Sequence, residues 1–203
     1  MRLLCGFILF TAVSFSQPFG FGIKAGVPLT DFLDAASNQQ FSFNTTTNRY
    51  VIGPMAELRL PFGLGVEVNA LYRHYGYAGA NTVNTATSVG AWEFPLVGKY
   101  RFKGSLIHPY LEAGVAWDKL SGLTQTVSST VASLAGTTSN PLELQHNVTT
   151  GFVFGGGLEV KLLMLRIAPG IRFTRWGDKH FLDPNGLLHS NLNQAEFLVG
   201  FKL

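Results

Sequence analysis

Hydrophobic residues alternate with polar or small residues along most of the chain from residue 19 onwards. In the first such segment Phe19, Phe21 and Ile23 occupy alternate positions, and the residues between them are glycines. Successive side chains of a strand point to opposite faces of a sheet, so a period of two predicts a strand with one apolar face. Eight segments show this pattern: residues 19–29, 50–60, 64–73, 92–102, 110–118, 152–162, 165–173 and 194–203.

The connections between these segments alternate strictly between long and short. The long connections are residues 30–47, 76–87, 121–147 and 177–191. An even strand number, with short turns at one end and long loops at the other, is the pattern of bacterial outer-membrane barrels. The sequence therefore predicts an all-β fold, an eight-stranded antiparallel up-and-down transmembrane β-barrel.

The polar face of the segments carries many glycines together with charged residues of both signs. The interior of an eight-stranded barrel is only wide enough for side chains, so small residues beside ion pairs suit it. We therefore predict a charge network that fills the lumen and plugs it. Its members are Lys24, Glu57, Arg59, Glu67, Arg73, Glu93, Arg101, Glu112, Glu159, Lys161, Arg166, Arg172 and Glu196.

The apolar face repeats Phe, Leu and Ile, which would overfill so narrow a barrel if they pointed inward. Alternation alone also fits a soluble ligand-binding barrel, and packing favours the membrane alternative, with outer-membrane lipid as the partner of this face. Aromatic residues near the segment ends are typical of interfacial girdles. These are Tyr50, Tyr72, Trp92, Tyr100 and Trp117.

The N-terminus has the pattern of a secretory signal peptide. Arg2 precedes an apolar run over residues 3–15, which is shorter than the roughly 20 residues of a membrane-spanning helix. Cleavage after Ser16 gives a signal peptide over residues 1–16 and one barrel domain over residues 17–203. The single cysteine, Cys5, lies in the predicted signal peptide, so we expect no disulfide in the exported chain. A lipoprotein is disfavoured because the apolar run follows Cys5.

Composition fits export to a membrane better than binding to nucleic acid. Hydrophobic residues make up 46% of the chain and charged residues only 13%. The formal net charge of +3 is too small to indicate a nucleic-acid partner. No residue pattern identifies a partner for the loops. The long connections at residues 30–47 and 121–147 either extend the strands beyond the membrane or form passive tips.

Three segments carry a resemblance to a known group of proteins. Residues 19–27, 109–115 and 197–203 look like parts of the small outer-membrane β-barrel families that include OmpX and the transmembrane domain of OmpA. The resemblance covers residues 19–203 and implies the barrel fold and location in the cell outer membrane. It also implies that the barrel-assembly machinery recognises the last strand, which in these families usually ends on an aromatic residue. This chain ends on Leu203, with Phe201 two positions earlier.

The fourth long connection holds the best candidates for a metal site. Asp178, His180, Asp183 and His189 could share a divalent ion. Their spacing matches no known metal-binding motif, such as H-E-x-x-H. We therefore expect solvated loop residues, and no metal or other cofactor.

His74 is the candidate general base if the protein modifies lipids as an acyl-transfer enzyme or esterase. Alternation places His74 on the face that points to lipid or to the rim, and no motif ties a serine to it. We therefore expect a barrel that is not an enzyme, with a structural or surface-interaction role. A lipid-modifying enzyme and a narrow channel remain the alternatives.

Overall fold

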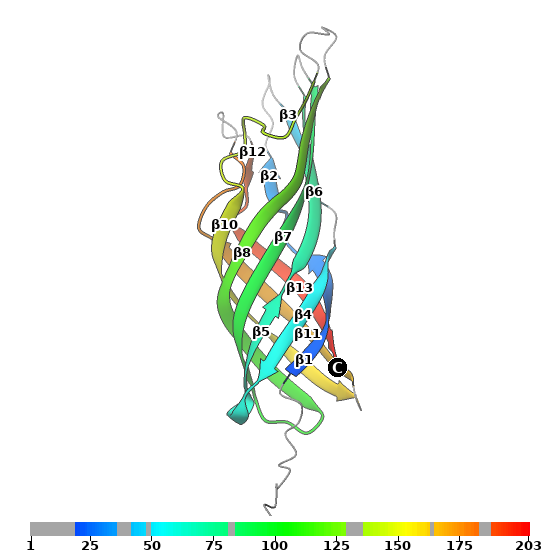
Figure 1. The fold of residues 1–203 in the computed structure, drawn as a ribbon, viewed down its shortest axis with the longest axis vertical. Helices are drawn as coiled ribbons and strands as arrows, with labels where there is room; N and C mark the ends of the chain where they lie inside the picture. The colour runs from blue at the N-terminus through cyan, green and yellow to red at the C-terminus, as the bar shows by residue number, and fades with distance from the viewer. Residues whose placement is uncertain are drawn as a thin grey trace, which may run out of the picture.

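The computed structural model consists almost entirely of antiparallel β-strands (Figure 1). It describes residues 19–35, 42–47, 50–80, 84–128, 136–162, 165–182 and 188–203. The predicted signal peptide over residues 1–16 lies outside these residues. Within the described chain, no helix is long and apolar enough to cross a membrane.

The described strands form a closed barrel with eight wall positions, each called a stave below, which confirms the predicted fold class. One stave is interrupted and consists of two strands, β5 and β6. The barrel strands are β1 (Phe19–Pro28), β4 (Val51–Arg59), β5 (Leu64–Asn69), β6 (Leu71–Ala80), β7 (Asn84–Arg101), β8 (Ile107–Ser128), β10 (Val148–Leu162), β11 (Leu165–Trp176) and β13 (Asn193–Lys202). Each stave pairs with its neighbours along the chain, and β1 pairs with both β4 and β13 to close the ring.

The connection between β4 and β5 shows how the sequence makes a tight turn. A single 3-10 turn, η1 (Pro61–Gly63), joins the two strands. Proline suits the first position of such a turn because its φ is fixed and it needs no N–H partner. Phe62 and Gly63 both have positive φ, at 64° and 81°. This end of the barrel, called the short-turn end below, also holds the C-terminus (Figure 1).

At the opposite, long-loop end, three strands continue into the connections predicted from the sequence. Residues 76–87 were predicted to be a long connection, and this prediction is wrong: the β6–β7 pairing continues to Gly79 and Thr85. The reason is that Tyr75 and Tyr77 keep the period of two and bury their rings. β8 likewise extends to Ser128, into the predicted third connection.

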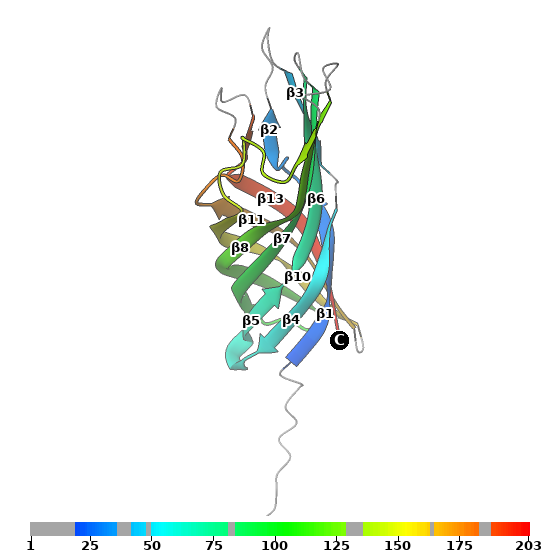
Figure 2. The same cartoon turned by 45° about the horizontal axis from the view of Figure 1, so that its top comes forward.

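Short strands, among them β2 and β3, lie at the long-loop end of the barrel (Figure 2), together with a cluster of buried apolar residues. The short strands are β2 (Leu33–Ala35), β3 (Ser42–Thr47), β9 (Gly136–Thr138) and β12 (Leu188–Ser190). β2 pairs with β12, β3 with β6, and β9 with β8. The buried residues, called the cap cluster below, are Phe32, Leu33, Tyr75, Tyr77, Val89, Ala91, Leu120, Phe181 and Leu188.

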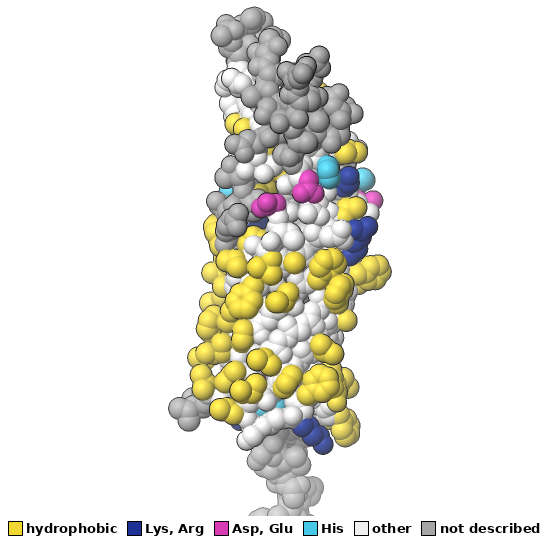
Figure 3. Space-filling model, turned by 180° about the vertical axis from the view of Figure 1, so that it is seen from behind, with side chains coloured by type: hydrophobic (Ala, Val, Ile, Leu, Met, Phe, Trp, Pro, Cys, Tyr) yellow, Lys and Arg dark blue, Asp and Glu magenta, His cyan; other side chains and the backbone are white. Residues whose placement is uncertain are grey.

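The outer surface of the barrel carries a broad band of hydrophobic side chains (Figure 3). Charged side chains gather above this band, towards the long-loop end. Phe21, Phe152 and Ile171 are each more than half exposed. The apolar face of the strands therefore points outward, as predicted. Of the predicted girdle residues, Tyr50, Trp92, Tyr100 and Trp117 are exposed, and Tyr72 packs beside Trp92 with ring centroids 5.2 Å apart.

Candidate functional site

The polar face of the strands points into the barrel and forms layers of ion pairs there. The layer nearest the short-turn end is centred on two glutamates, Glu57 and Glu159. Lys202 Nζ lies 2.7 Å from Glu57 Oε2 and 2.6 Å from Glu159 Oε2. Arg101 also pairs with both glutamates. Arg166 pairs with Glu159 at 3.2 Å, and Arg59 lies 3.7 Å from Glu57.

The middle layer is centred on Glu67, which is fully buried. Lys24 pairs with its Oε1 atom, and Lys99 Nζ lies 2.6 Å from its Oε2 atom. Arg172 contributes a longer contact to Glu67 at 3.7 Å and donates a 2.9 Å hydrogen bond to Glu112. Lys99 lies 3.4 Å from Glu112 and therefore links the two carboxylates.

A third layer lies closer to the long-loop end and is centred on Arg73. This guanidinium pairs with Glu93 and lies 3.3 Å from Glu196. It also donates a 2.8 Å hydrogen bond to the side-chain oxygen of Gln194. These four residues come from β6, β7 and β13, so the layer ties together staves that are not all neighbours.

Glycines on neighbouring strands make room for these large side chains. Lys24 is flanked by Gly53 on β4 and Gly200 on β13. Gly155 lies between Glu112 on β8 and Arg172 on β11. A Cβ atom at Gly155 would lie 2.6 Å from the backbone oxygen of Ile171 and 3.3 Å from Glu112 Cγ. The alternation of glycine and charge around the barrel therefore lets the ion pairs fill its cross-section.

The structure brings all of the predicted network residues together in the lumen except Lys161. Lys161 is exposed at the end of β10, and in the described chain it makes no ion pair. Two further lysines, Lys99 and Lys202, belong to the network but were not among the residues predicted for it. Both lie on the polar face of their strands, so the signal that could have identified them was the same alternation.

A buried histidine closes the long-loop end above the third layer. His180 Nε2 lies 3.2 Å from Asp118 Oδ2, which can only accept a hydrogen bond from it, and 3.2 Å from Thr149 Oγ1. Its Nδ1 atom lies 2.7 Å from the backbone oxygen of His146. His180 also packs against Phe32, with ring centroids 5.9 Å apart. It therefore joins polar residues of the barrel wall to the cap cluster.

The structure does not bring the predicted metal-site residues together. His180 is committed to Asp118, and Asp178 is exposed. His189 lies near a different carboxylate, with Nε2 3.6 Å from Asp34 Oδ2. Asp183 lies outside the described residues. In the described chain, no group of three or more His, Cys, Asp or Glu side chains is arranged to hold a metal ion.

His74 lies on the outer side of β6, as predicted, and contacts a serine there. Its Nε2 atom is 3.1 Å from Ser88 Oγ on β7. A Ser–His–carboxylate arrangement would also require a carboxylate on the other ring nitrogen. Within the described residues, His74 makes no hydrogen bond or ion pair with a carboxylate.

Comparison with known proteins supports the class of protein that the fold defines. Residues 15–177 match the family described as outer membrane protein beta-barrel domain. No curated protein matches the chain in sequence. The chain is similar in fold to the outer membrane protein OprG from Pseudomonas aeruginosa, with a TM-score of 0.55 and 12% sequence identity over 91% of this chain and 94% of that chain.

Two other solved structures were found with lower TM-scores. Neisserial surface protein A, NspA, has a TM-score of 0.47 and 13% identity over 91% of this chain and 95% of that chain. The N-terminal β-barrel domain of OprF from Pseudomonas aeruginosa has a TM-score of 0.38 and 16% identity over 92% of this chain and 98% of that chain.

The fold and the outward apolar face define the class as a small β-barrel protein of the outer membrane. The chain belongs to the outer membrane protein beta-barrel domain family. This result confirms the resemblance to small outer-membrane barrels and the predicted location in the outer membrane.

Proposed function

We propose that the protein is a closed outer-membrane barrel that does not conduct and has a structural or surface-interaction role. The observation that carries this proposal is that layers of side chains follow one another along the lumen. Three layers of buried ion pairs cross the barrel, and the cap cluster lies above them. An eight-stranded lumen is just filled by its own side chains, so these layers leave little room for a path of water.

The long-loop end offers surfaces for contact with other molecules. β3 and β9 lie at the two ends of the described sheet order, and all three residues of β9 are exposed. Strands at a sheet edge present unpaired backbone N–H and C=O groups, to which another chain can add a strand. We place the interaction role at this end of the barrel, above the apolar band.

Planar-bilayer recording tests the closed lumen. The full chain is refolded in detergent, and its folding is checked by circular dichroism and by a change in gel migration on boiling. We expect no discrete conductance steps from the folded barrel. Ohmic steps whose number follows the amount of folded protein would contradict the proposal and favour the narrow channel.

A lipid-modifying activity is the second candidate function, because Ser88 and His74 lie in hydrogen-bond contact on the outer wall. We rank it lower because His74 has no carboxylate partner in the described chain. The test is release of fatty acid from outer-membrane lipid by the wild type and by the His74→Ala and Ser88→Ala variants. Release that both substitutions abolish would establish the enzyme, and equal background release from all three would remove it.

A further inference from the structure

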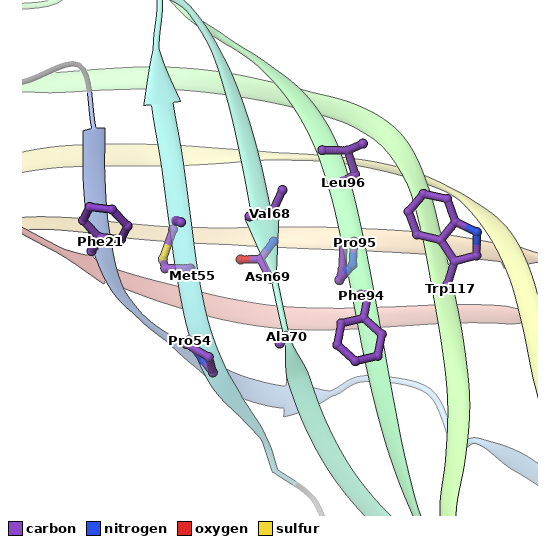
Figure 4. Close-up of a pocket in the computed structure, with 11 residues that line it drawn as sticks. Phe21, Pro54, Met55, Val68, Asn69, Ala70, Phe94, Pro95, Leu96 and Trp117 are labelled. Carbon is purple, nitrogen blue, oxygen red and sulfur yellow. The ribbon is translucent and has the colours of Figure 1, made fainter.

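The outer wall of the barrel and its short-turn end differ in what they offer a ligand. The wall has an apolar groove, whose outward-facing side chains include Phe21, Phe94 and Leu96 (Figure 4). These side chains belong to the apolar band and select no single ligand from the lipid around it. The short-turn end instead holds positive charge that the described chain does not balance.

The layer nearest the short-turn end contains more basic than acidic side chains. Its carboxylates are Glu57 and Glu159. Arg101 and Lys202 each contact both of them, and these two cations already balance the two negative charges. The layer has two further arginines, which are Arg59 on β4 and Arg166 on β11. The charge of these two arginines is therefore in excess.

The guanidinium of Arg59 has unused hydrogen-bond donors. Its Nε atom lies 3.7 Å from Glu57 Oε1, which is too far for a hydrogen bond. Nε and Nη2 are buried and have no hydrogen-bond partner in the described chain, and buried donors without a partner are unfavourable. The side chain is 14% exposed. Because Arg59 is the last residue of β4, its side chain can turn these donors towards the mouth of the barrel without displacing a strand.

Two further cations lie around the same mouth. Arg166 donates to Glu159 through Nη1 at 3.2 Å, and its side chain is 20% exposed. Among the charges around Arg59, that of Arg166 acts most strongly, ahead of Glu57, so the two guanidinium groups lie near each other and repel. The exposed Lys161 lies directly opposite Arg166 on β10, and like charges in this position are destabilising. An anion between the two arginines would offset this repulsion.

The donors and the charge of the two arginines restrict the type of anion. A guanidinium presents its N–H donors in a planar fork that matches the oxygens of phosphate. A phosphate monoester carries about −1.5 to −2 at pH 7, which balances two arginines, whereas a carboxylate balances only one. The terminal carboxylate of Leu203 lies at the same end, and within the described chain it forms no ion pair.

We propose that a phosphate group with a free terminus binds at the short-turn mouth, between Arg59 and Arg166. Its oxygens accept hydrogen bonds from Arg59 and from the nitrogens of Arg166 that do not contact Glu159. Short turns of outer-membrane barrels face the periplasm, so the phosphate is either inorganic phosphate or the head group of an inner-leaflet lipid. The site is independent of the closed lumen, because the ligand does not pass the layers.

Calorimetric titration of inorganic phosphate into the refolded full chain tests the site. The chain is kept in micelles of a non-ionic detergent, in a phosphate-free buffer of about 0.15 M ionic strength, which screens weak attraction to exposed charges. We expect saturable binding of one phosphate per barrel. Absence of saturable binding of both inorganic phosphate and the lipid phosphate described below would overturn the proposal.

Three arginine variants locate the bound phosphate. Arg59→Gln and Arg166→Gln are each expected to weaken binding about 10- to 100-fold, the effect of losing hydrogen bonds from a charged donor. Arg175→Gln is the control, because Arg175 is exposed towards the long-loop end of β11 and bonds to Asn193. Its affinity should equal that of the wild type. Equal weakening in all three variants would indicate unspecific attraction and overturn the proposal.

Urea unfolding separates phosphate binding from a structural role of Arg59. Phosphate should raise the urea midpoint of the wild type, because a ligand stabilises the state that binds it, and it should leave the midpoint of Arg59→Gln unchanged. Without phosphate the two proteins should unfold at similar urea concentrations, because Arg59 makes only the 3.7 Å contact to a carboxylate. Equal shifts in both proteins would overturn the proposal. Arg166→Gln provides the same comparison if Arg59→Gln fails to fold.

Short-chain phosphatidic acid identifies the source of the phosphate, with short-chain phosphatidylcholine as the control lipid. Tighter binding of phosphatidic acid than of inorganic phosphate would assign the site to a lipid head group, and the reverse order would assign it to free phosphate. Phosphatidylcholine that binds as tightly as phosphatidic acid would contradict a site for a free phosphate terminus. Planar-bilayer recording remains a separate readout, so the lumen and phosphate proposals can fail independently.

Discussion

At the scale of single residues, the buried charges are arranged so that each central carboxylate contacts several cations. Glu67 contacts Lys24, Lys99 and Arg172, and Glu159 contacts three basic residues in the same way. Desolvation of a charge is costly, and one partner alone often does not compensate for it. When several cations contact one carboxylate, their attractions together compensate for the desolvation of that carboxylate. The charges then form a network, in which the loss of one member affects all the others.

Replacing Glu67 with Gln is expected to destabilise the barrel strongly. The substitution keeps the shape of the side chain but leaves Lys24 and Lys99 buried without their common counter-charge. Breaking a buried pair in this way costs about 3–5 kcal/mol. The free energy of unfolding, measured by urea titration of the barrel in detergent micelles, should fall by that amount.

Lys161→Gln is the matched control for this experiment. Lys161 is also a charged residue on a barrel strand, but it is exposed and has no ion pair in the described chain. Surface substitutions of this kind change stability by about 0.5 kcal/mol or less. If Glu67→Gln were as stable as Lys161→Gln, the network would be a consequence of packing that contributes little to stability.

The alternation along the strands predicted which side chains point into the lumen. It did not predict at which residue each strand passes the end of the lumen. Lys161 follows the same pattern as Glu159 two residues earlier, and only the end of the barrel, set by the β10–β11 turn, leaves it exposed. Lys202 lies one residue from the chain end, yet it is fully buried between two glutamates. Its position depends on closure of β13 against β1, which is a non-local contact.

At the scale of elements, the long connections fold back over the barrel. Backbone hydrogen bonds join three of them: Asn191 donates to Phe32 at 2.8 Å, and Leu182 donates to Glu143 at 2.8 Å. Phe32 and Phe181, which take part in these bonds or precede a residue that does, belong to the cap cluster. His180 connects the cap to the barrel wall, because it contacts Asp118 on β8 and Thr149 on β10.

Replacing His180 with Ala is expected to loosen the cap without unfolding the barrel. The change leaves Asp118 buried without its imidazole partner, which costs about 1–3 kcal/mol. Local opening should become about 5 to 150 times more frequent, because 1.4 kcal/mol corresponds to a factor of ten. Trypsin cleavage after Lys179, followed by mass spectrometry, measures this opening under conditions in which the barrel keeps its unboiled gel migration.

His189→Ala is the matched histidine control for the cap. His189 and its partner Asp34 are both substantially exposed, so the pair is expected to contribute about 1 kcal/mol or less. Its cleavage rate should therefore stay close to that of the wild type. Equal cleavage of the His180→Ala and wild-type proteins would show that the cap is held by apolar packing alone.

The sequence predicted the elements of the barrel more accurately than those of the cap. Strands such as β1 and β13 alternate large apolar residues with small or charged ones, a pattern that is local. Cap residues such as Phe32 and Phe181 lie in connections with no period, and they are buried only because distant loops meet. Residues 76–87 are a different case, because Tyr75 and Tyr77 keep the period of two, whereas the Thr and Ala residues that follow fit strand and loop equally well.

At the scale of the whole molecule, the lumen layers and the cap lie one above the other along a single axis. The middle layer and the cap cluster involve different residues, although β7 and β8 contribute to both, so the side chains of each can be replaced while those of the other remain. Water and ions that cross the barrel would have to pass every layer. The barriers therefore act in series, and the highest one that remains determines the conductance.

This arrangement predicts that conductance appears only when the lumen and the cap are opened together. Replacing Lys24, Glu67, Glu112 and Arg172 with Ala removes two charges of each sign from the middle layer and much of its side-chain volume. Phe181→Ser together with His180→Ala opens the cap. We expect each set of substitutions alone to give no conductance steps in planar bilayers. We expect the combined variant to give only small steps, because the third layer and the layer nearest the short-turn end still cross the lumen.

A further pair of substitutions therefore completes the experiment: Arg73→Ala with Glu93→Ala, which removes the central cation of the third layer and one of its carboxylate partners. Added to the combined variant, it should increase the conductance, whereas added to the wild type it should leave the barrel closed. Folding of every variant is checked by the change in gel migration on boiling. Conductance in the wild type carrying only this pair of substitutions would show that one layer, rather than the series, closes the barrel.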